Sequence, residues 1–301
     1  MRQRPLWRAA DATILAKRLL LTVPAALLGD AGLDRLASAL GDLLPGAARS
    51  RIGIAAALGL ARDDPVVDRA FRDSRCQELF ADLCVMRSRL RPGWRPPLRL
   101  EGAEHLVAAQ AAGRGAVLWV AMFATASLVA KMALHDAGWP LVHLSRESHG
   151  WSTSRLGIRW LNPLIVRAET RFLAERVTIG RDLAADQAVR RLVAALAANR
   201  VVSVSAQGSG ADETRIGWLR LPTGAIRIAL AARAPLLPVL THREPDGTHV
   251  VRIAEPLAVP PGPRREAVPA MARAMAAVVD AAMRERPGQY VWRTVRIPGA
   301  Q

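Results

Sequence analysis

The chain has 301 residues, 51% of them apolar, and a formal net charge of +16 at neutral pH. Its length allows a substantial buried core, and its apolar content excludes a protein that is disordered throughout. Arginine supplies almost all of the positive charge, because Lys17 and Lys131 are the only lysines. This charge is spread along the chain and forms no basic block, so we do not expect a nucleic-acid-binding protein. Arginines with scattered tryptophans suit an anionic membrane surface at least as well.

The cysteine content excludes a disulfide scaffold, because Cys76 and Cys84 are the only cysteines. On one helix their spacing would put them about two turns apart, too far for a disulfide bond. We therefore expect two reduced, buried thiols. No group of cysteines and histidines has the spacing of a zinc site, so the sequence predicts neither a metal nor another cofactor.

The first 90 residues show the periodicity of helices. Their longest apolar stretch, Leu19–Leu28, directly follows Lys17 and Arg18. A stretch of about ten residues cannot cross a bilayer core, which needs about 20, but it can lie in the membrane interface. A cleaved signal peptide is the alternative, although the stretch begins late and no Ala-x-Ala site follows promptly. We predict that this segment associates with a membrane without spanning it.

Two further signals divide the chain. Asp64-Pro65 predicts the start of a long helix, because proline is favoured in the first helical turn. Residues 91–97 (RPGWRPP) are rich in residues that break helices and strands. They predict a boundary between a helical, membrane-associating cap (1–97) and an α/β core (98–301).

From Leu98 onward, short apolar runs alternate with helical patterns. The predicted strands are 116–121, 140–145, 164–167, 201–205, 236–241 and 249–254. The predicted helices are 123–137, 152–160, 184–198, 222–233 and 267–285, and 207–221 is predicted to be a loop. Alternating strands and helices favour an α/β fold with a mostly parallel central sheet flanked by helices, behind the helical N-terminal cap.

Several short motifs follow one another in a characteristic order. They are Glu101–Leu106 (EGAEHL), Gly113–Val120 (GRGAVLWV), Arg146 at the end of a strand, Thr223-Gly224 at the start of a helix, Arg233–Pro238 (RAPLLP) and Arg243–Gly247 (REPDG). In this order they resemble the late lipid A acyltransferases, the bacterial lauroyl/myristoyl family within the lysophospholipid-acyltransferase-like superfamily. The resemblance covers roughly residues 98–296. It implies an acyl thioester donor, acyl-CoA or acyl carrier protein, and a peripheral place on the cytoplasmic face of the inner membrane.

The family places a histidine, four residues and then an acidic residue just after the first core strand. The histidine acts as general base for the acceptor, and the carboxylate orients it. In this chain Met122 takes the place of the histidine and Ser127 that of the acid. A thioether cannot accept a proton, and a hydroxyl gives no anionic support to an imidazolium. These two positions therefore predict that the usual reaction is altered or lost.

A second departure follows the fourth strand, where the family usually has an acidic residue and this chain has Ala206-Gln207. Arg146 does match the family arginine and is expected to bind phosphate, because guanidinium pairs with phosphate through two hydrogen bonds. The resemblance also makes Thr125, Gln207, Thr223 and Gly224 candidate substrate-binding residues. Arg155, Arg159 and Arg171 are further candidates for phosphate or coenzyme A binding, with solubility as the alternative. Trp151 and Trp160 are expected on one side of a helix, in core packing or at a membrane interface.

The remaining histidines are the candidates for a replacement base. His149, in the loop after the second strand, is the best placed. His143 is expected in the core, and His242 and His249 beside a hairpin far from the cleft. His135 and Asp136 are expected to point apart. Thr125 or Ser127 would serve as a nucleophile only with a base nearby, which the sequence does not show.

These residues predict acyl transfer from a thioester donor to an unusual acceptor. An amine or thiol fits best, because a neutral amine or a thiolate attacks without prior removal of a proton by a base. The alternative is a catalytically silent acyltransferase-like protein that binds a lipid, an acyl chain or a partner enzyme. The oligomeric state stays open.

Overall fold

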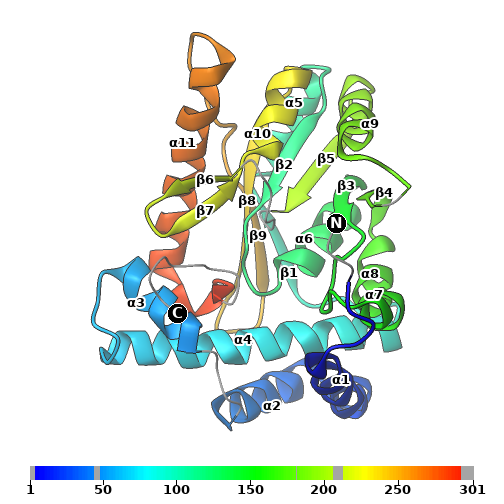
Figure 1. Cartoon of the computed structure of the whole chain (residues 1–301), viewed down its shortest axis with the longest axis vertical. Helices are drawn as coiled ribbons and strands as arrows, with labels where there is room; N and C mark the ends of the chain where they lie inside the picture. The colour runs from blue at the N-terminus through cyan, green and yellow to red at the C-terminus, as the bar shows by residue number, and fades with distance from the viewer. Residues whose placement is uncertain (1–3, 44–47, 181, 206–212, 293–301) are drawn as a thin grey trace.

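The structure is a computed structural model that describes residues 4–43, 48–180, 182–205 and 213–292 (Figure 1). Four helices precede the first strand: α1 (Ala9–Leu27), α2 (Asp30–Leu43), α3 (Ala48–Leu58) and α4 (Pro65–Leu90). The predicted start of the long helix is confirmed, since the Asp64 carboxylate accepts a hydrogen bond of 2.8 Å from the Val66 amide. Within the described residues, no helix combines the length and apolar character needed to cross a membrane.

The strands are β1 (Leu98–Glu101), β2 (Ala116–Val120), β3 (Leu141–Arg146), β4 (Leu173–Ile179), β5 (Val201–Ser205), β6 (Glu213–Ile216), β7 (Leu219–Pro222), β8 (Leu236–Arg243) and β9 (His249–Ile253). Seven of them form one sheet in the order β1-β9-β8-β2-β5-β3-β4. Strands β8, β2, β5, β3 and β4 are mutually parallel, whereas β9 is antiparallel to β8 and β1 is parallel to β9. The predicted α/β fold with a mostly parallel sheet is confirmed.

The helices after β1 are α5 (Ala103–Ala111), α6 (Ala126–Asp136), α7 (Arg155–Trp160), α8 (Asn162–Thr170), α9 (Ala185–Ala197), α10 (Gly224–Ala232) and α11 (Arg264–Glu285), followed by a short 3₁₀ turn, η1 (Pro287–Gln289). They flank the sheet (Figure 1). The buried faces of these helices are their apolar faces. Helix α6, for example, buries most of its apolar residues, because it lies between the sheet and a second layer.

Two sequence predictions were wrong. Residues 164–167 lie in helix α8, and the strand is β4, a few residues further on. A short apolar run fits a buried strand and a buried helix equally well, and here Pro163 lies in the first turn of a helix. The loop predicted at 207–221 contains the hairpin β6–β7 in its described part, with Gly217 in the turn at φ +56°. Tight turns with positive φ favour glycine.

Helix α4 lies across the carboxyl edge of the parallel strands, and α1 and α2 lie on its outer side (Figure 1). The first half of α4, with Val67 and Phe71, shares the main core with the sheet. Its second half, with Leu79 and Leu83, forms another core with α1, α2, α6 and α8. The N-terminal helices therefore form a cap over the sheet edge where ligands of parallel α/β proteins bind. The division into two domains at residue 97 stays a prediction.

Candidate functional site

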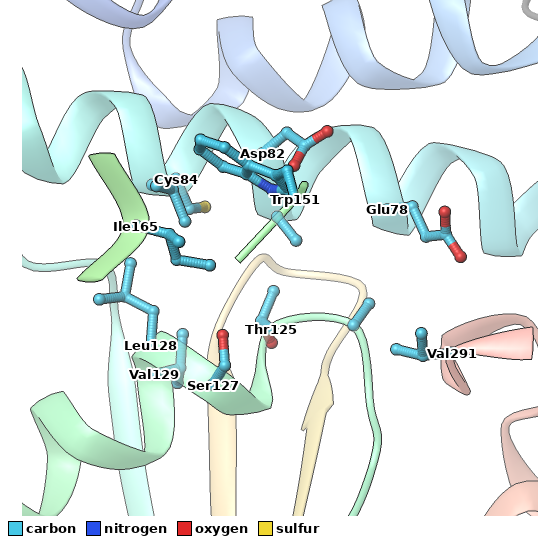
Figure 2. A pocket seen from close by; sticks show the side chains of 13 residues that line it. Glu78, Asp82, Cys84, Thr125, Ser127, Leu128, Val129, Trp151, Ile165 and Val291 are labelled. Atoms are coloured by element: carbon cyan, nitrogen blue, oxygen red, sulfur yellow. The ribbon is translucent and has the colours of Figure 1, made fainter. Parts of the chain in front are cut away.

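A small cavity lies between α4 and the carboxyl edge of the sheet. Its walls come from Glu78, Asp82 and Cys84 of α4, the segment 124–129, and Trp151, Ile165 and Val291 (Figure 2). Its volume is about 50 Å³, which is enough for one or two water molecules. Ligand sites for small molecules usually measure about 300–1,000 Å³. With α4 in this position, the cavity is too small for an acyl chain.

The segment from Met122 to Ser127 lies beside this cavity. Met122 is half-buried against the main core and is not part of the cavity wall, and its backbone oxygen accepts a hydrogen bond of 2.9 Å from Val291. Thr125, directly before α6, and Ser127, in its first turn, both line the cavity (Figure 2). The backbone oxygen of Ser127 accepts a hydrogen bond from the Lys131 ammonium. Neither a base nor an acid is present in this segment.

An imidazole and a carboxylate do meet close to this cavity, beside Lys131 of α6. The Nε2 atom of His149 lies 3.1 and 3.2 Å from the two carboxylate oxygens of Glu169 on α8. Glu169 is fully buried and also pairs with Arg176 at 2.8 Å and Lys131 at 3.4 Å. Burial would raise the pKa of Glu169, but the Lys131 and His149 charges and hydrogen bonds hold it well below its usual range. The carboxylate is therefore ionised and can support a protonated His149.

The sequence prediction missed Glu169 because it assigned the preceding residues to a strand. A helical assignment would have shown the signal. Ile165 and Glu169 are four residues apart on α8, and Ser127 and Lys131 are four apart on α6. Residues at this spacing share one helix face. The cavity and the buried charge cluster therefore lie one turn apart along two neighbouring helices.

His249 also reaches the site, which corrects the expectation that it lies far from the cleft. Its Nδ1 atom is 3.3 Å from the Thr125 hydroxyl, and its ring stacks on Phe80 of α4 with centroids 5.9 Å apart. Because β9 is antiparallel to β8, its first residue lies at the carboxyl edge of the parallel strands. Burial, together with the neighbouring Arg243 charge, lowers the pKa of His249 to about 3. This imidazole stays neutral and is a poor proton acceptor.

The other histidines have structural surroundings. His143 is buried in β3 and lies 2.8 Å from the Ser203 hydroxyl, and burial lowers its pKa well below the usual value. It is a core histidine, as expected. His242 lies 2.9 Å from Glu244 beside the hairpin. The expectation that His135 and Asp136 point apart was wrong: they are 3.2 Å apart, at the end of α6, where Arg95 also binds the Asp136 carboxylate.

Ion pairs join α1 to α4 beside the cavity. Asp82, in the cavity wall, pairs with Lys17 at 2.7 Å and with Arg18 at 2.8 Å. The Arg18 guanidinium lies 3.7 Å from the centre of the Trp151 ring. Both lysines of the chain thus pair with buried carboxylates next to the cavity. Cys84 is a free, buried thiol, and burial raises its pKa, so it is an inert part of the wall.

The predicted anion-binding residues are dispersed. Arg146 ends β3 on the surface and is not part of the cavity wall. Thr223 is buried directly before α10, Gly224 is the first residue of that helix, and Gln207 lies outside the described residues. Arg171 donates hydrogen bonds to Ser88 and Pro92 and so joins α8 to the end of α4. The anion-binding residues predicted from the sequence therefore do not form one site in the structure.

Trp151 and Trp160 do not lie on the same helix, because only Trp160 belongs to α7. Trp151 forms part of the cavity wall, whereas Trp160 is 67% exposed. The two tryptophans were expected on one side of one helix. The helix begins only at Arg155, so Trp151 is free to turn inward from the preceding loop.

Comparison with known proteins gives little further information. No family model matches the chain, and no curated protein matches it in sequence. The chain is similar in structure to the 1-acyl-sn-glycerophosphate (LPA) acyltransferase PlsC from Thermotoga maritima, with a TM-score of 0.39 and 14% sequence identity. The match covers 88% of this chain and 97% of that chain. Because this similarity is so distant, the side chains of the present protein have to carry the functional proposal.

Proposed function

We propose that the protein transfers an acyl group from a thioester donor to an acceptor at the carboxyl edge of the sheet. The observation that supports this is the pairing of His149 with the buried Glu169 carboxylate. It supplies the imidazole and the anionic partner that the segment from Met122 to Ser127 lacks. His149 is only partly buried, with 17% of its side chain exposed, so a reactant can reach it.

The two ring nitrogens of His149 have different roles in this reaction. Nε2 faces Glu169, so it carries the proton of the neutral ring, and Nδ1 is left to accept one. The acceptor attacks the thioester carbon while Nδ1 takes the proton from the attacking atom. The carbon–sulfur bond then breaks, and the thiol of the donor leaves with a proton. The ionised Glu169 stabilises the imidazolium formed in between.

The acceptor is proposed to be an amine or a thiol. A hydroxyl has to lose its proton as it attacks, whereas a neutral amine is already nucleophilic and needs a base such as Nδ1 only to take up its extra proton after the attack. Arg146 is proposed to bind a phosphate of the donor, acyl-CoA or acyl carrier protein, because it lies on the same loop as His149. Thr125 and Ser127, in the cavity wall, are proposed to contact the acyl carbonyl.

A second candidate function is a catalytically silent protein that binds a lipid, an acyl chain or a partner enzyme. The small cavity favours it, because 50 Å³ cannot accept a thioester unless α4 moves. The absence of a base at Met122 favours it too. The two candidates differ in one measurable way, since only the first gives a product.

We propose that the protein lies on the cytoplasmic face of the inner membrane without spanning it. The outer face of α1 carries Leu19, Leu20, Val23 and Leu27, all 61–75% exposed. Its inner face is fixed to the core, because the buried Asp11 carboxylate accepts a 2.5 Å hydrogen bond from Ser152. An exposed apolar helix face beside arginines is typical of proteins that bind membrane interfaces. High salt or carbonate should release much of the protein from membranes, and release by detergent alone would contradict this proposal.

The test uses purified full-length protein with acyl-CoA and with acyl carrier protein donors. Amine, thiol and hydroxyl acceptors and a lipid extract are supplied in turn, and mass spectrometry detects acylated products. We expect transfer to an amine or thiol and little transfer to a hydroxyl. Absence of product from every combination, together with tight binding of a lipid, would support the silent alternative. Efficient acylation of a hydroxyl would contradict the proposed acceptor class.

A further inference from the structure

The carboxylate of Glu169 is shared by three basic side chains that come from different elements. Its Oε2 atom lies 3.1 Å from Nε2 of His149, 3.4 Å from the Lys131 ammonium on α6 and 2.8 Å from the Arg176 guanidinium on β4. Glu169 is fully buried, and the side chains of Lys131 and Arg176 are only 5% and 9% exposed. The proposed reaction uses His149 and Glu169 but gives the two cations no role.

This cluster contains one cation more than its single carboxylate balances. An ammonium and a guanidinium against one carboxylate leave a positive charge in excess even before His149 takes up a proton. His143 of β3 also faces the cluster, but burial lowers its pKa well below the usual value, so it adds no charge. Glu147, in the loop of His149, pairs with Arg4 at 2.8 Å, so these two charges balance each other. The excess therefore acts on His149.

The excess charge opposes the effect of the carboxylate on the imidazole. A buried carboxylate alone favours the imidazolium form of a neighbouring histidine, whereas a nearby cation disfavours it. The nitrogens of Lys131, Arg176 and His149 all contact the same oxygen of Glu169, so they lie within a few ångströms of one another. A general base needs this balance, because it has to be neutral before the attack and to hold a proton during it.

Further contacts fix both cations in place. The Lys131 ammonium donates a second hydrogen bond to the backbone oxygen of Ser127, one turn earlier on α6. Burial lowers the pKa of Lys131, but the ion pair with the carboxylate opposes this change and favours the ammonium form. Arg176 also donates hydrogen bonds of 3.0 Å to the Thr170 hydroxyl and 3.1 Å to the Ser145 hydroxyl. Neither cation is therefore free to turn toward solvent when the imidazole becomes protonated.

We propose that Lys131 and Arg176 are positioning residues of the transfer reaction, which act through Glu169 to keep His149 neutral until the acceptor attacks. The proposal rests on the proposed function, because it concerns the general base of that reaction. In the neutral ring Nδ1 is free to take the proton of the acceptor. Glu169 then balances the imidazolium that forms, and the two cations favour the release of its proton in the next step.

Removal of either cation should move the titration of His149 to higher pH. Lys131→Met leaves Glu169 paired with Arg176, and Arg176→Gln leaves it paired with Lys131, so both variants should fold. In each, the midpoint of the His149 titration should rise by at least about one pH unit, the usual effect of one charge within about 4–6 Å. Nuclear magnetic resonance of the histidine ring protons in the full chain measures this midpoint without any substrate, and His149→Gln identifies the signal.

The pH dependence of acyl transfer gives a second reading that a purely structural role would not produce. The acidic limb of the pH–rate profile should move upward in Lys131→Met by the same amount as the titration, so most of the lost rate should return at higher pH. A structural role would lower the rate equally at every pH. Arg176→Lys, which keeps the positive charge, should restore the midpoint that Arg176→Gln shifts.

Lys17→Met is the matched control, because Lys17 is the other lysine of the chain and also shares a buried carboxylate, Asp82, with an arginine. It removes the same side chain and the same charge, and it should leave the midpoint of His149 unchanged. Equal shifts in Lys17→Met and Lys131→Met would show a general charge effect and overturn the proposal. An unchanged midpoint in Lys131→Met or in Arg176→Gln would overturn it too, and if one variant fails to fold, the other decides.

The two measurements also separate this proposal from the proposed reaction. A shifted titration of His149 without acyl transfer to any acceptor would support the effect of the two cations and count against the enzyme. Acyl transfer with the same titration midpoint in the unaltered chain and in both variants would support the enzyme and overturn the role of Lys131 and Arg176.

Discussion

Two regions at the carboxyl edge of the sheet differ in their chemistry. The segment from Met122 to Ser127, which follows β2, offers a thioether and hydroxyls, and the imidazole that reaches it, His249, is fully buried and neutral. The region between β3 and α8 holds His149 against an ionised carboxylate, Glu169, with two more cations around it. An imidazole and a carboxylate that are absent from the first segment are therefore present as a pair elsewhere at the same edge of the sheet.

The largest expected effect separates the two histidines. His149→Gln should lower the rate of acyl transfer about 10²- to 10⁴-fold, the usual contribution of a positioned base. His249→Gln should lower it far less, because an imidazole with a pKa of about 3 takes up a proton poorly. Initial rates with one donor and one amine acceptor measure both, and circular dichroism checks that each variant folds. A larger loss of rate in His249→Gln than in His149→Gln would show that the general base is His249, next to Thr125.

Glu169→Gln should destabilise the fold by about 3–5 kcal/mol, because it leaves the buried Lys131 and Arg176 without an anionic partner. Urea unfolding of the variant and the unaltered chain measures the difference. Glu104→Gln is the control. The Glu104 side chain is 75% exposed, so this substitution should change the free energy of unfolding little. A loss as small as that of the control would mean that the charge cluster is not a buried network in solution.

The pH dependence of stability should reveal the buried neutral His249. Its pKa is about 3 in the folded chain and about 6.5 in the unfolded one, so only the unfolded chain binds the proton between these values. His249 therefore adds no pH dependence above pH 6.5 and lowers stability by about 1.4 kcal/mol for each unit that the pH falls below it, down to about pH 3.

Comparing urea unfolding of the unaltered chain with that of His249→Gln isolates this contribution, because the other titrating groups, including His143, are common to both. The difference in unfolding free energy between the two proteins should shrink as the pH falls from 6.5. A constant difference across this range would show that His249 is hydrated and not buried beneath Phe80.

The smallest effect concerns Arg146, which belongs to the same loop as His149. Arg146→Ala should weaken binding of the acyl donor about 10- to 100-fold, because a charge-assisted contact to phosphate contributes about 1.5–3 kcal/mol. Arg190→Ala, an exposed arginine on α9, serves as the control and should leave donor affinity unchanged. Unchanged donor affinity in the Arg146 variant would remove this residue from the site and leave His149 as the one functional residue of its loop.

Much of the fold was readable from the sequence. The start of α4 at Asp64-Pro65, the strands β2, β3, β5, β8 and β9 and the mostly parallel sheet were all predicted, because periodicity and turn residues are local signals. The failures were local ambiguities. A short apolar run became the helix α8, and a polar, glycine-containing stretch formed the hairpin β6–β7, whose strands each have four residues.

The site was predicted less well. Met122, Thr125 and Ser127 were placed at the correct edge of the sheet, but the partner of His149 was missed, and His249 was put in the wrong place. Glu169 stands 20 residues from His149, and His249 stands 124 residues from Thr125. No spacing rule joins residues so far apart, because their contact depends on which strands are neighbours and in which direction they run.

The sequence by itself determined most of the helices and strands, the α/β class, the apolar face of α1 and the lack of a base and an acid after β2. Each of these depends on residues that are close in the chain, where propensity and periodicity act directly. Only the tertiary structure decided that α4 closes the carboxyl edge, that Glu169 lies against His149 and that β9 brings His249 to Thr125. These contacts follow from strand order and helix packing, which bring distant residues together to bury apolar surface and to give each buried charge a partner.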